Sequence, residues 1–365
     1  MSFPTDITNI QNQLNRIDPK AYAASRNYLN GAVTRLSPYL SRGVISTRQI
    51  LQSLANRGFD FGQVEVLVRE LAWREFYQRV WQSRNPDDDL RHTQSPCIGP
   101  GLCHSIVHAS TGIDAIDASI RTLSETGYMH NHCRMYTAAL HCNLGQRAWI
   151  DGAQWMYYHL LDGDWASNAC SWQWVAGSFS SKKYYANQEN INRYTGSTQT
   201  DTFLDVPYES FPEMPVPAVL ADSTGIELST TLPASDPIPE KFRGKVFLYN
   251  YYNMDSTWCA PEEGLRILLL EPEHFRRYPV SEQCIRFLLD LAGNIPGVIV
   301  RCESFASLQQ QLPDVEFQFR EHPITRHYTG VMHHREWMCD EVTGYFPSFF
   351  AYWKRAEKHL RRYFG

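Results

Sequence analysis

The sequence predicts a mainly α protein, with an all-helical domain followed by a small α/β domain. Its 365 residues are 43% hydrophobic and 13% aromatic, which is typical of a folded globular chain with one large core or two ordinary ones. Up to about residue 205, apolar residues recur at three- and four-residue spacing, whereas beyond residue 243 short apolar runs alternate with helical patterns. This change of period indicates two domains.

The helical domain is expected over residues 1–205. Two stretches, EVLVRELAWREFYQRVW (65–81) and IDASIRTLSETGYMHNHCRMYTAALHCNL (116–144), show the helical period most clearly, and β-branched alternation is absent. Residues 206–243 hold seven prolines among Ser, Thr and Glu. Such a composition supports neither a helix nor a strand, so we interpret this stretch as a linker.

The α/β domain is expected over residues 244–365. Its short apolar runs and helical patterns follow one another in the order that joins parallel strands through helices. The expected strands are 245–252, 265–272 and 297–302, and the expected helices are 280–293, 304–312 and 348–364. The domain therefore resembles a small parallel sheet covered by helices, with a long helix at its end.

Composition also limits the class of protein. No stretch approaches the roughly 18 consecutive apolar residues of a membrane helix, and the first residues lack the basic and apolar parts of a leader peptide. The nine cysteines are scattered without CxxC pairs, which suits reduced thiols. We therefore expect a soluble cytoplasmic monomer. The net charge of −5 does not exclude a nucleic-acid partner, because a local basic rim can still meet phosphate.

One group of cysteines and histidines, residue types that commonly bind zinc, has the wrong spacing for a metal site. The cluster lies in a stretch rich in glycine and proline, and its spacing fits no common zinc pattern, so no metal is expected. Its members are Cys97, Cys103, His104 and His108.

The stretch TRLSPYLSRG (34–43) could hold a phosphate. Two hydroxyls and a guanidinium precede Pro38, a residue suited to the first helical turn, where free backbone N–H groups favour an anion. A simple helix N-cap explains the same pattern when it is taken alone.

The stretch ELAWREF (70–76) places a carboxylate, an indole and a guanidinium on one helix face. Glu70, Trp73 and Arg74 fall within one turn and so lie close together. A tryptophan in the core beside an ion pair on the surface would give the same sequence pattern.

The stretch TGYMHNHCRM (126–135) also has one polar helix face. Asn131, Arg134 and Met135 lie at i, i+3 and i+4, with His130 and His132 beside them. Such side chains are costly to bury unless a polar ligand meets them, although a single histidine is usually structural.

The stretch DGDWASNACSWQWVAG (162–177) combines acids with indoles. Asp162 and Asp164 could accept hydrogen bonds from a heterocycle or pair with Arg134. Trp172 could carry an electron and Trp174 could stack on a base, while bulky core packing remains the alternative for both.

In this order and at these separations, the four stretches resemble the flavin-binding helical domain of the photolyase and cryptochrome family. The resemblance covers about residues 20–195, has motifs similar to class I photolyases of cyclobutane dimers, and lacks the usual N-terminal antenna domain. It implies bound FAD. The residues that it implies for FAD are Tyr22, Thr34, Arg35, Leu36, Ser37, Arg74, Asn131, Arg134, Asp162, Gly163, Asp164 and Asn168.

The resemblance further implies light-driven repair of UV-damaged DNA, in which excited reduced flavin donates an electron to a flipped cyclobutane pyrimidine dimer. Trp172 and Trp149 would pass electrons to the flavin, Asn168 would face flavin N5, and Glu70 would meet the dimer. The residues implied for the substrate cavity are Glu70, Trp73, Asn131, His132, Met135 and Trp174.

The chain departs from the family in three ways. The α/β part follows the helical domain and resembles a shortened antenna-type domain, so an antenna chromophore is not predicted. The outermost electron-relay tryptophan has no clear counterpart, which leaves Trp155, Trp165 or a tyrosine for that role. Thr195 and Gly196 stand where the iron–sulfur branch continues to its cysteines, so no iron–sulfur cluster is expected.

Three functions fit these observations. The first is the light-driven repair lyase. The second is a cryptochrome-like blue-light sensor that binds FAD and signals through a partner, and the third is a flavin-binding protein without photochemistry.

Overall fold

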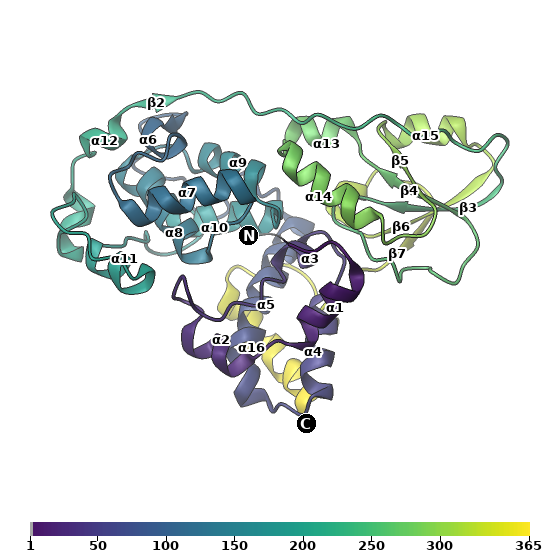
Figure 1. The fold of residues 1–365 in the computed structure, drawn as a ribbon, viewed down its shortest axis with the longest axis horizontal. Coiled ribbons are helices and arrows are strands. Elements are labelled where there is room, and N and C mark those ends of the chain that lie inside the picture. Colours follow the sequence, from purple (N-terminus) through teal and green to yellow (C-terminus); the bar gives the residue numbers. More distant parts are fainter. Residues whose placement is uncertain (1–2) are drawn as a thin grey trace. The chain divides into compact units, whose positions relative to one another are not determined.

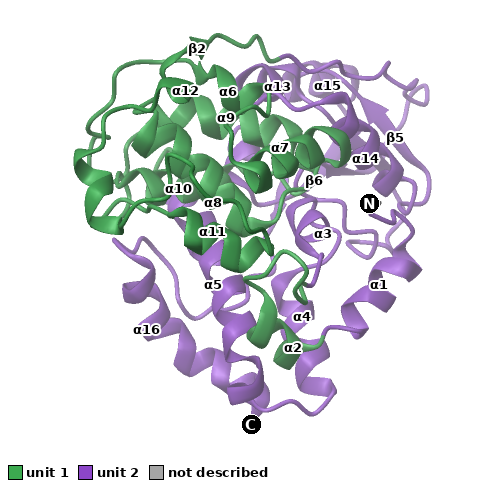
Figure 2. Cartoon of the chain, turned by 60° about the vertical axis from the view of Figure 1, so that its left-hand side comes forward, with its two compact units in different colours: residues 1, 18–33, 84–228 green, residues 2–17, 34–83, 229–365 purple. Residues whose placement is uncertain are grey.

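The computed structural model describes residues 3–365, which form two compact units. Among these residues, the helical unit contains 18–33 and 84–228, and the mixed unit contains 3–17, 34–83 and 229–365 (Figure 2). The division does not follow chain order and differs from the predicted domains at 1–205, 206–243 and 244–365. The units are discontinuous because segments that are distant in the sequence pack together. The core helix at 61–83, for example, lies against the helix at 349–360.

Three helices of the helical unit pack together along the predicted motifs. Helix α8 (Asn131–Ala139) continues into a π-helical turn, η1 (Leu140–Leu144), and packs on α10 (Trp165–Ala176), which also packs on α9 (Trp149–His159). The α9–α10 contact needs Gly152, because a Cβ there would lie 2.3 Å from the Trp172 ring. The other helices of this unit up to residue 205 are α2 (Pro19–Ser25), α6 (His104–Val107), α7 (Asp114–Thr126) and α11 (Gln188–Thr195).

The predicted linker contains short regular elements. They are η2 (Tyr208–Glu213), α12 (Ala218–Ala221) and β2 (Ser223–Thr224). Strand β2 pairs antiparallel with β1 (Leu102–Cys103), so the expectation that the linker has no helix or strand is wrong at these three places. The many prolines misled the prediction, because proline interrupts long helices and strands but is compatible with single helical turns.

The mixed unit contains a five-stranded parallel sheet in the order β5-β4-β3-β6-β7 (Figure 1). The predicted parallel strands are confirmed as β3 (Gly244–Tyr249), β4 (Leu265–Leu269) and β5 (Val298–Arg301). The additional strands are β6 (Val315–Arg320) and β7 (Val331–His333). A core of aliphatic and aromatic side chains from β3, β4 and β6 packs on α15 (Phe305–Gln311).

The remaining helices of the mixed unit fall into two sets. Along the sheet sequence they are α13 (Pro272–Arg277), α14 (Glu282–Ala292) and η3 (Pro323–Thr325). The all-helical part consists of α1 (Ile7–Asn15), α3 (Ser37–Ser41), α4 (Thr47–Asn56), α5 (Phe61–Ser83), α16 (Phe349–Leu360) and η4 (Arg361–Phe364). Helices α5 and α16 lie side by side in both views (Figures 1 and 2). Within residues 3–365, no helix is both long and apolar enough to cross a membrane.

Candidate functional site

The predicted site residues are divided between the two units. The helical unit holds Tyr22, Asn131, His132, Arg134, Met135, Trp149, Asp162, Gly163, Asp164, Asn168, Trp172 and Trp174. The mixed unit holds Thr34, Arg35, Leu36, Ser37, Glu70, Trp73 and Arg74.

An ion pair lies at the centre of the helical unit's polar residues. The Nη2 atom of Arg134 donates to both carboxylate oxygens of Asp162, at 3.0 and 2.9 Å. The Arg134 Nε atom donates to the backbone oxygen of Met129 at 2.8 Å, which fixes the plane of the guanidinium. Pairing with Arg134 was one of the two roles that the sequence allowed for Asp162, and the structure has it.

The turn into α10 positions the second acid. Asp164 is the N-cap of α10, and its Oδ1 atom accepts from the Ser167 backbone N–H at 2.8 Å. Gly163 allows this tight turn, because a Cβ there would lie 2.9 Å from the Leu160 oxygen. One turn into the helix, Asn168 is buried, and its amide nitrogen donates to the Ala153 oxygen at 2.7 Å. That bond fixes the orientation of the Asn168 amide.

Histidines stand at the start of α8. The Nδ1 atom of His130 accepts from the His132 backbone N–H at 3.2 Å, and burial lowers the pKa of the His130 ring. Burial, with the nearby charges of His130 and Arg26, lowers the pKa of His132 to about 4. His132 is therefore neutral at pH 7. On the same helix, the Asn131 amide contacts the Met135 sulfur at 3.7 Å, as their i, i+4 spacing predicts.

The tryptophans of the helical unit are packed and specifically partnered. Trp172 is buried and meets His141 edge-on, with 5.7 Å between the ring centroids. The indole N–H of Trp149 donates to Asp89 at 2.8 Å. Trp174 is half-buried beside Tyr184, at 5.9 Å. Ordinary core packing thus accounts for Trp172 and Trp149, and an electron-relay role for them remains a prediction.

The two other relay candidates are also buried. Trp165 donates its indole N–H to Asp87 at 2.7 Å, and Trp155 lies 5.8 Å from His159. Sequence reasoning missed Asp87 and Asp89 as indole partners. The acidic run that contains them was the available signal, because a buried indole N–H needs an acceptor.

The proposed phosphate loop lies in the mixed unit, just before α3. Arg35 has a φ of 54°, an uncommon conformation for a residue with a Cβ atom. The backbone oxygen of Thr34 accepts from Gln13 at 2.9 Å, and Ser37 begins α3. Arg74 reaches the same helix, where its Nη1 atom donates to the Ser41 hydroxyl at 3.2 Å. Arg74 therefore lies against α3, and its implied contact with a cofactor stays a prediction.

Trp73 has a neighbour that the sequence did not indicate. The Phe349 ring, from the start of α16, stacks on the indole with 3.7 Å between centroids and 10° between planes. Trp73 is half-buried and Phe349 is buried. One face of the indole is therefore occupied by the chain itself, so a substrate dimer could use only its other face or its edge.

A buried carboxylate one turn beyond Glu70 was also missed. Glu75 accepts from Arg79 Nη2 at 3.1 Å, from the Tyr352 hydroxyl at 2.7 Å and from the Cys339 N–H at 3.3 Å, and also from the Met338 N–H. Burial raises the pKa of the Glu75 carboxyl, and the charge of Arg79 opposes that rise. The spacing of Glu75 and Arg79 was visible in the sequence, but their burial against α16 was not.

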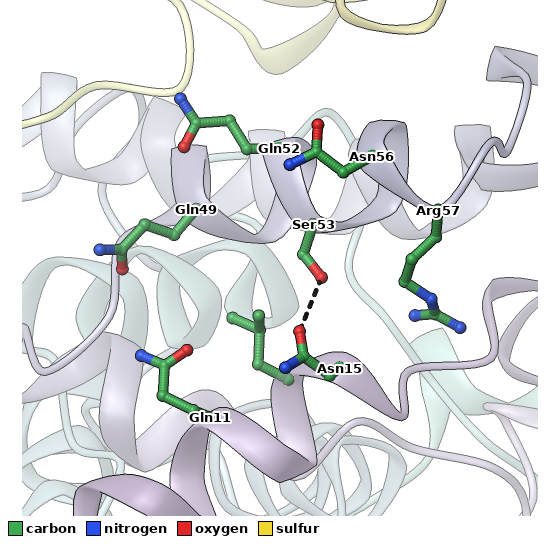
Figure 3. A pocket seen from close by; sticks show the side chains of 8 residues that line it. Gln11, Asn15, Gln49, Gln52, Ser53, Asn56 and Arg57 are labelled. Atoms are coloured by element: carbon green, nitrogen blue, oxygen red, sulfur yellow. Dashed lines mark hydrogen bonds between the residues drawn. The ribbon is translucent and has the colours of Figure 1, made fainter.

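A pocket of about 320 Å³ lies between α1 and α4 in the mixed unit (Figure 3). Its lining is mostly amide side chains, and its cation, Arg57, donates to the Ile17 oxygen at 2.7 Å. None of the predicted site residues lines this pocket. Within residues 3–365, no group of three or more His, Cys, Asp or Glu side chains is arranged to hold a metal ion.

Comparison with known proteins identifies the helical segment. Residues 66–204 match the FAD binding domain of DNA photolyase. This segment, which runs from α5 to α11, is therefore similar to that domain. The match takes in α8, α9 and α10, and thus the Arg134–Asp162 pair.

Individual photolyases show the same relationship. The chain is 33% identical over 155 residues to the deoxyribodipyrimidine photo-lyase of Streptomyces griseus, covering 40% of this chain and 32% of that protein. It is 34% identical over 178 residues to the enzyme of a Synechococcus strain, covering 43% and 35%. The chain therefore spans about a third of the length of these relatives.

A solved structure is similar over a comparable share. The cryptochrome of Synechocystis sp. PCC6803 has a TM-score of 0.45 and 24% identity, covering 53% of this chain and 44% of that one.

Proposed function

We propose that this protein is a light-driven, FAD-dependent lyase that splits cyclobutane pyrimidine dimers in UV-damaged DNA. The observation that carries the proposal is the fixed Arg134–Asp162 pair, which stays partly open to solvent within a segment that matches a flavin-binding domain. A guanidinium–carboxylate pair that can still be reached suits a ligand with hydrogen-bonding groups.

The chemistry of these side chains fits a flavin. A flavin and an adenine both offer N–H donors, and Asp162 and Asp164 offer carboxylate oxygens. The Arg134 guanidinium keeps Asp162 in one orientation, and the Ala153 oxygen fixes the Asn168 amide. Gly163 allows the tight turn between Asp162 and Asp164. In this proposal, Thr34, Arg35, Leu36, Ser37, Arg74 and Tyr22 hold the remainder of the cofactor, and Asn131 contributes to the same site.

Bound reduced FAD would supply a light-excited electron donor. The protein's own residues would then hold the substrate: Glu70 and Asn131 would meet the carbonyl and N–H edge of an extruded dimer. His132, Met135 and Trp174 would line its cavity, with the edge or open face of Trp73. Extrusion of a dimer costs less than that of an intact base pair, because the damaged bases already stack poorly. Trp172 and Trp149 would bring electrons to the flavin.

A blue-light sensor is the second candidate. The observation that favours it is the stacking of Phe349 on Trp73, which occupies one face of the indole that the repair reaction would use. In that case the protein would bind FAD and respond to light without splitting dimers.

The deciding experiment is a repair assay on the purified full-length chain. The absorbance of bound flavin is recorded, the flavin is reduced, and an oligonucleotide with one cyclobutane thymine dimer is exposed to blue light. Light-dependent loss of the dimer is expected. Bound flavin without any loss of the dimer would favour the sensor, and a protein that cannot be loaded with flavin would contradict both.

Two variants test the assigned roles. Trp73→Ala is expected to abolish repair while flavin stays bound, and Trp172→Phe is expected to block photoreduction while chemically reduced protein still repairs. Normal repair by Trp73→Ala would remove Trp73 from the substrate cavity.

A further inference from the structure

The terminal helix α16 presents a hydrophobic ring to solvent. Phe350 is 71% exposed, more than any other large hydrophobic residue in the part of the chain that the structure describes. Its neighbour Phe349 is buried and holds the stack on Trp73. Phe350 itself lies edge-on to the Trp73 indole, with 6.5 Å between centroids and 76° between planes. Phe349 thus covers one face of Trp73, and Phe350 exposes a second aromatic ring beside the indole.

The outward direction of Phe350 is fixed by the packing of α16. The inner face buries Phe349, Tyr352, Trp353, Ala356 and Leu360. The hydroxyl of Tyr352 donates to the buried Glu75 carboxylate at 2.7 Å, which anchors the helix to α5. An anchored helix does not rotate freely, so Phe350 stays on the outer face of α16.

The face that carries Phe350 is cationic. Lys354 and Lys358 follow Phe350 at four-residue steps, so all three side chains lie on one side of the helix, with about 6 Å of axial rise per step. Both lysines are exposed, and neither forms an ion pair within residues 3–365. From residue 349 to 365 there are five Lys and Arg residues and one acid, Glu357, which pairs with Arg361. This local excess is notable because the whole chain has a net charge of −5.

An exposed aromatic ring followed by cations at regular steps suits one kind of partner. Single-stranded nucleic acid offers bases that can stack on a ring and phosphates that attract lysines. A hydrophobic peptide would use the ring but not the row of positive charges. Charge complementarity therefore favours a polyanion with flat, apolar bases.

We propose that α16 is a nucleic-acid contact of this protein, in which an unpaired base stacks on Phe350 and the adjoining phosphates meet Lys354 and Lys358. The proposal rests on the DNA partner of the proposed function. It adds a contact outside residues 66–204, the segment that matches the photolyase domain. In this proposal, the Phe349–Trp73 stack holds the neighbouring Phe350 ring in place for the bound nucleic-acid strand.

The test measures the affinity of the full-length chain for a fluorescent, undamaged, single-stranded oligonucleotide by anisotropy. Phe350→Ala is expected to weaken binding about tenfold, the scale of one base–aromatic stack. Phe350→Tyr keeps the ring and is expected to bind like the wild type. The double variant Lys354→Gln/Lys358→Gln is expected to weaken binding and to reduce the slope of log affinity against log salt by about 1.4, because each phosphate contact on a single strand contributes about 0.7.

Matched controls change similar residues elsewhere in the mixed unit. Met332→Ala removes a side chain of β7 whose residue is 49% exposed, and Arg276→Gln/Arg286→Gln removes two exposed charges from α13 and α14. Both controls are expected to bind like the wild type. If the α16 variants bind as the controls do while the wild type binds the oligonucleotide, the α16 contact is wrong and the proposed function stands.

A different pattern separates the two proposals in the other direction. If binding depends on Phe350 but the protein neither holds flavin nor repairs a dimer, the proposed function is wrong and the α16 contact stands as a nucleic-acid site. No binding of any oligonucleotide by the wild type would overturn both.

Discussion

The two units each contain a buried or partly buried arginine–carboxylate pair, and the two pairs differ in what surrounds them. In the mixed unit, Glu75 and Arg79 are almost inaccessible, and the Glu75 carboxylate is met by donors from the chain's own α16 and the segment before it. In the helical unit, Asp162 is buried, whereas its partner Arg134 is partly exposed. The chain encloses the first pair, and the second pair stays open on the arginine side.

This difference teaches that residue types alone do not separate a structural ion pair from a binding pair. What separates them is whether a ligand can still reach the charged groups. An enclosed pair contributes to stability when it is kept whole, and loss of one partner leaves an uncompensated charge. A pair that stays partly open to solvent is a candidate for recognition.

The largest expected effect is on the Glu75 pair. Glu75→Ala leaves Arg79 buried without its carboxylate and removes the acceptor of Tyr352, so we expect a loss of about 3–5 kcal/mol in the free energy of unfolding. Chemical denaturation measures it. The matched control is Glu65→Ala, which breaks the exposed i, i+4 pair with Arg69 on the same helix and should cost about 0.5 kcal/mol or less. Equal losses in the two variants would contradict the distinction.

The second-largest expected effect is a loss of folding stability at acidic pH. The pKa of His132 is lowered to about 4, so the folded protein keeps this ring neutral while the unfolded chain takes up a proton below about pH 6.5. Stability should therefore fall as the pH falls from about 6.5 towards 4. After allowance for its partial exposure, we expect His132 to contribute about 1 kcal/mol to the loss between pH 7 and pH 5.

Denaturation at both pH values, in the wild type and in His132→Gln, measures this contribution. The variant should show a shallower dependence on pH. A dependence of the same steepness in both proteins would mean that folding does not shift the pKa of His132.

The smallest effect on stability belongs to the recognition pair. Asp162→Asn should cost about 1 kcal/mol or less in unfolding free energy, because the Arg134 side chain can still reach water. Its effect on bound flavin should be far larger, and flavin absorbance per folded molecule measures it. Asp117→Asn is the control, since Asp117 is a buried carboxylate of the same unit that accepts from Thr111. The comparison fails if both variants retain the same amount of flavin.

Local patterns were sufficient to predict much of the fold. The helical period over 65–81 and 116–144 places α5, α7 and α8, and apolar runs place β3, β4 and β5. The linker prediction failed at η2, α12 and β2, since single turns and a two-residue pairing leave almost no periodic signal. Strand β6 was also missed, although its sequence VEFQFR alternates apolar and polar residues.

The predicted site also has parts that follow from local sequence and parts that depend on long-range packing. The spacing of Asn131, Arg134 and Met135 on α8 follows from helix geometry, and so does the N-cap role of Asp164. The stack of Phe349 on Trp73 could not be predicted, because 276 positions separate these residues and no local rule joins them. Long-range packing decides which face of a predicted side chain is available.

The discontinuous mixed unit also has a consequence for the time course of synthesis. Glu75 emerges from the ribosome 277 residues before its partner Tyr352. At about 5–20 residues per second, α5 waits on the order of 10–60 s for the helix that covers it. The helical unit ends at residue 228 and can close earlier, while the mixed unit still exposes its apolar α5 face. The Glu75 carboxylate therefore receives its donors from Met338, Cys339 and Tyr352 only after these late residues have been made.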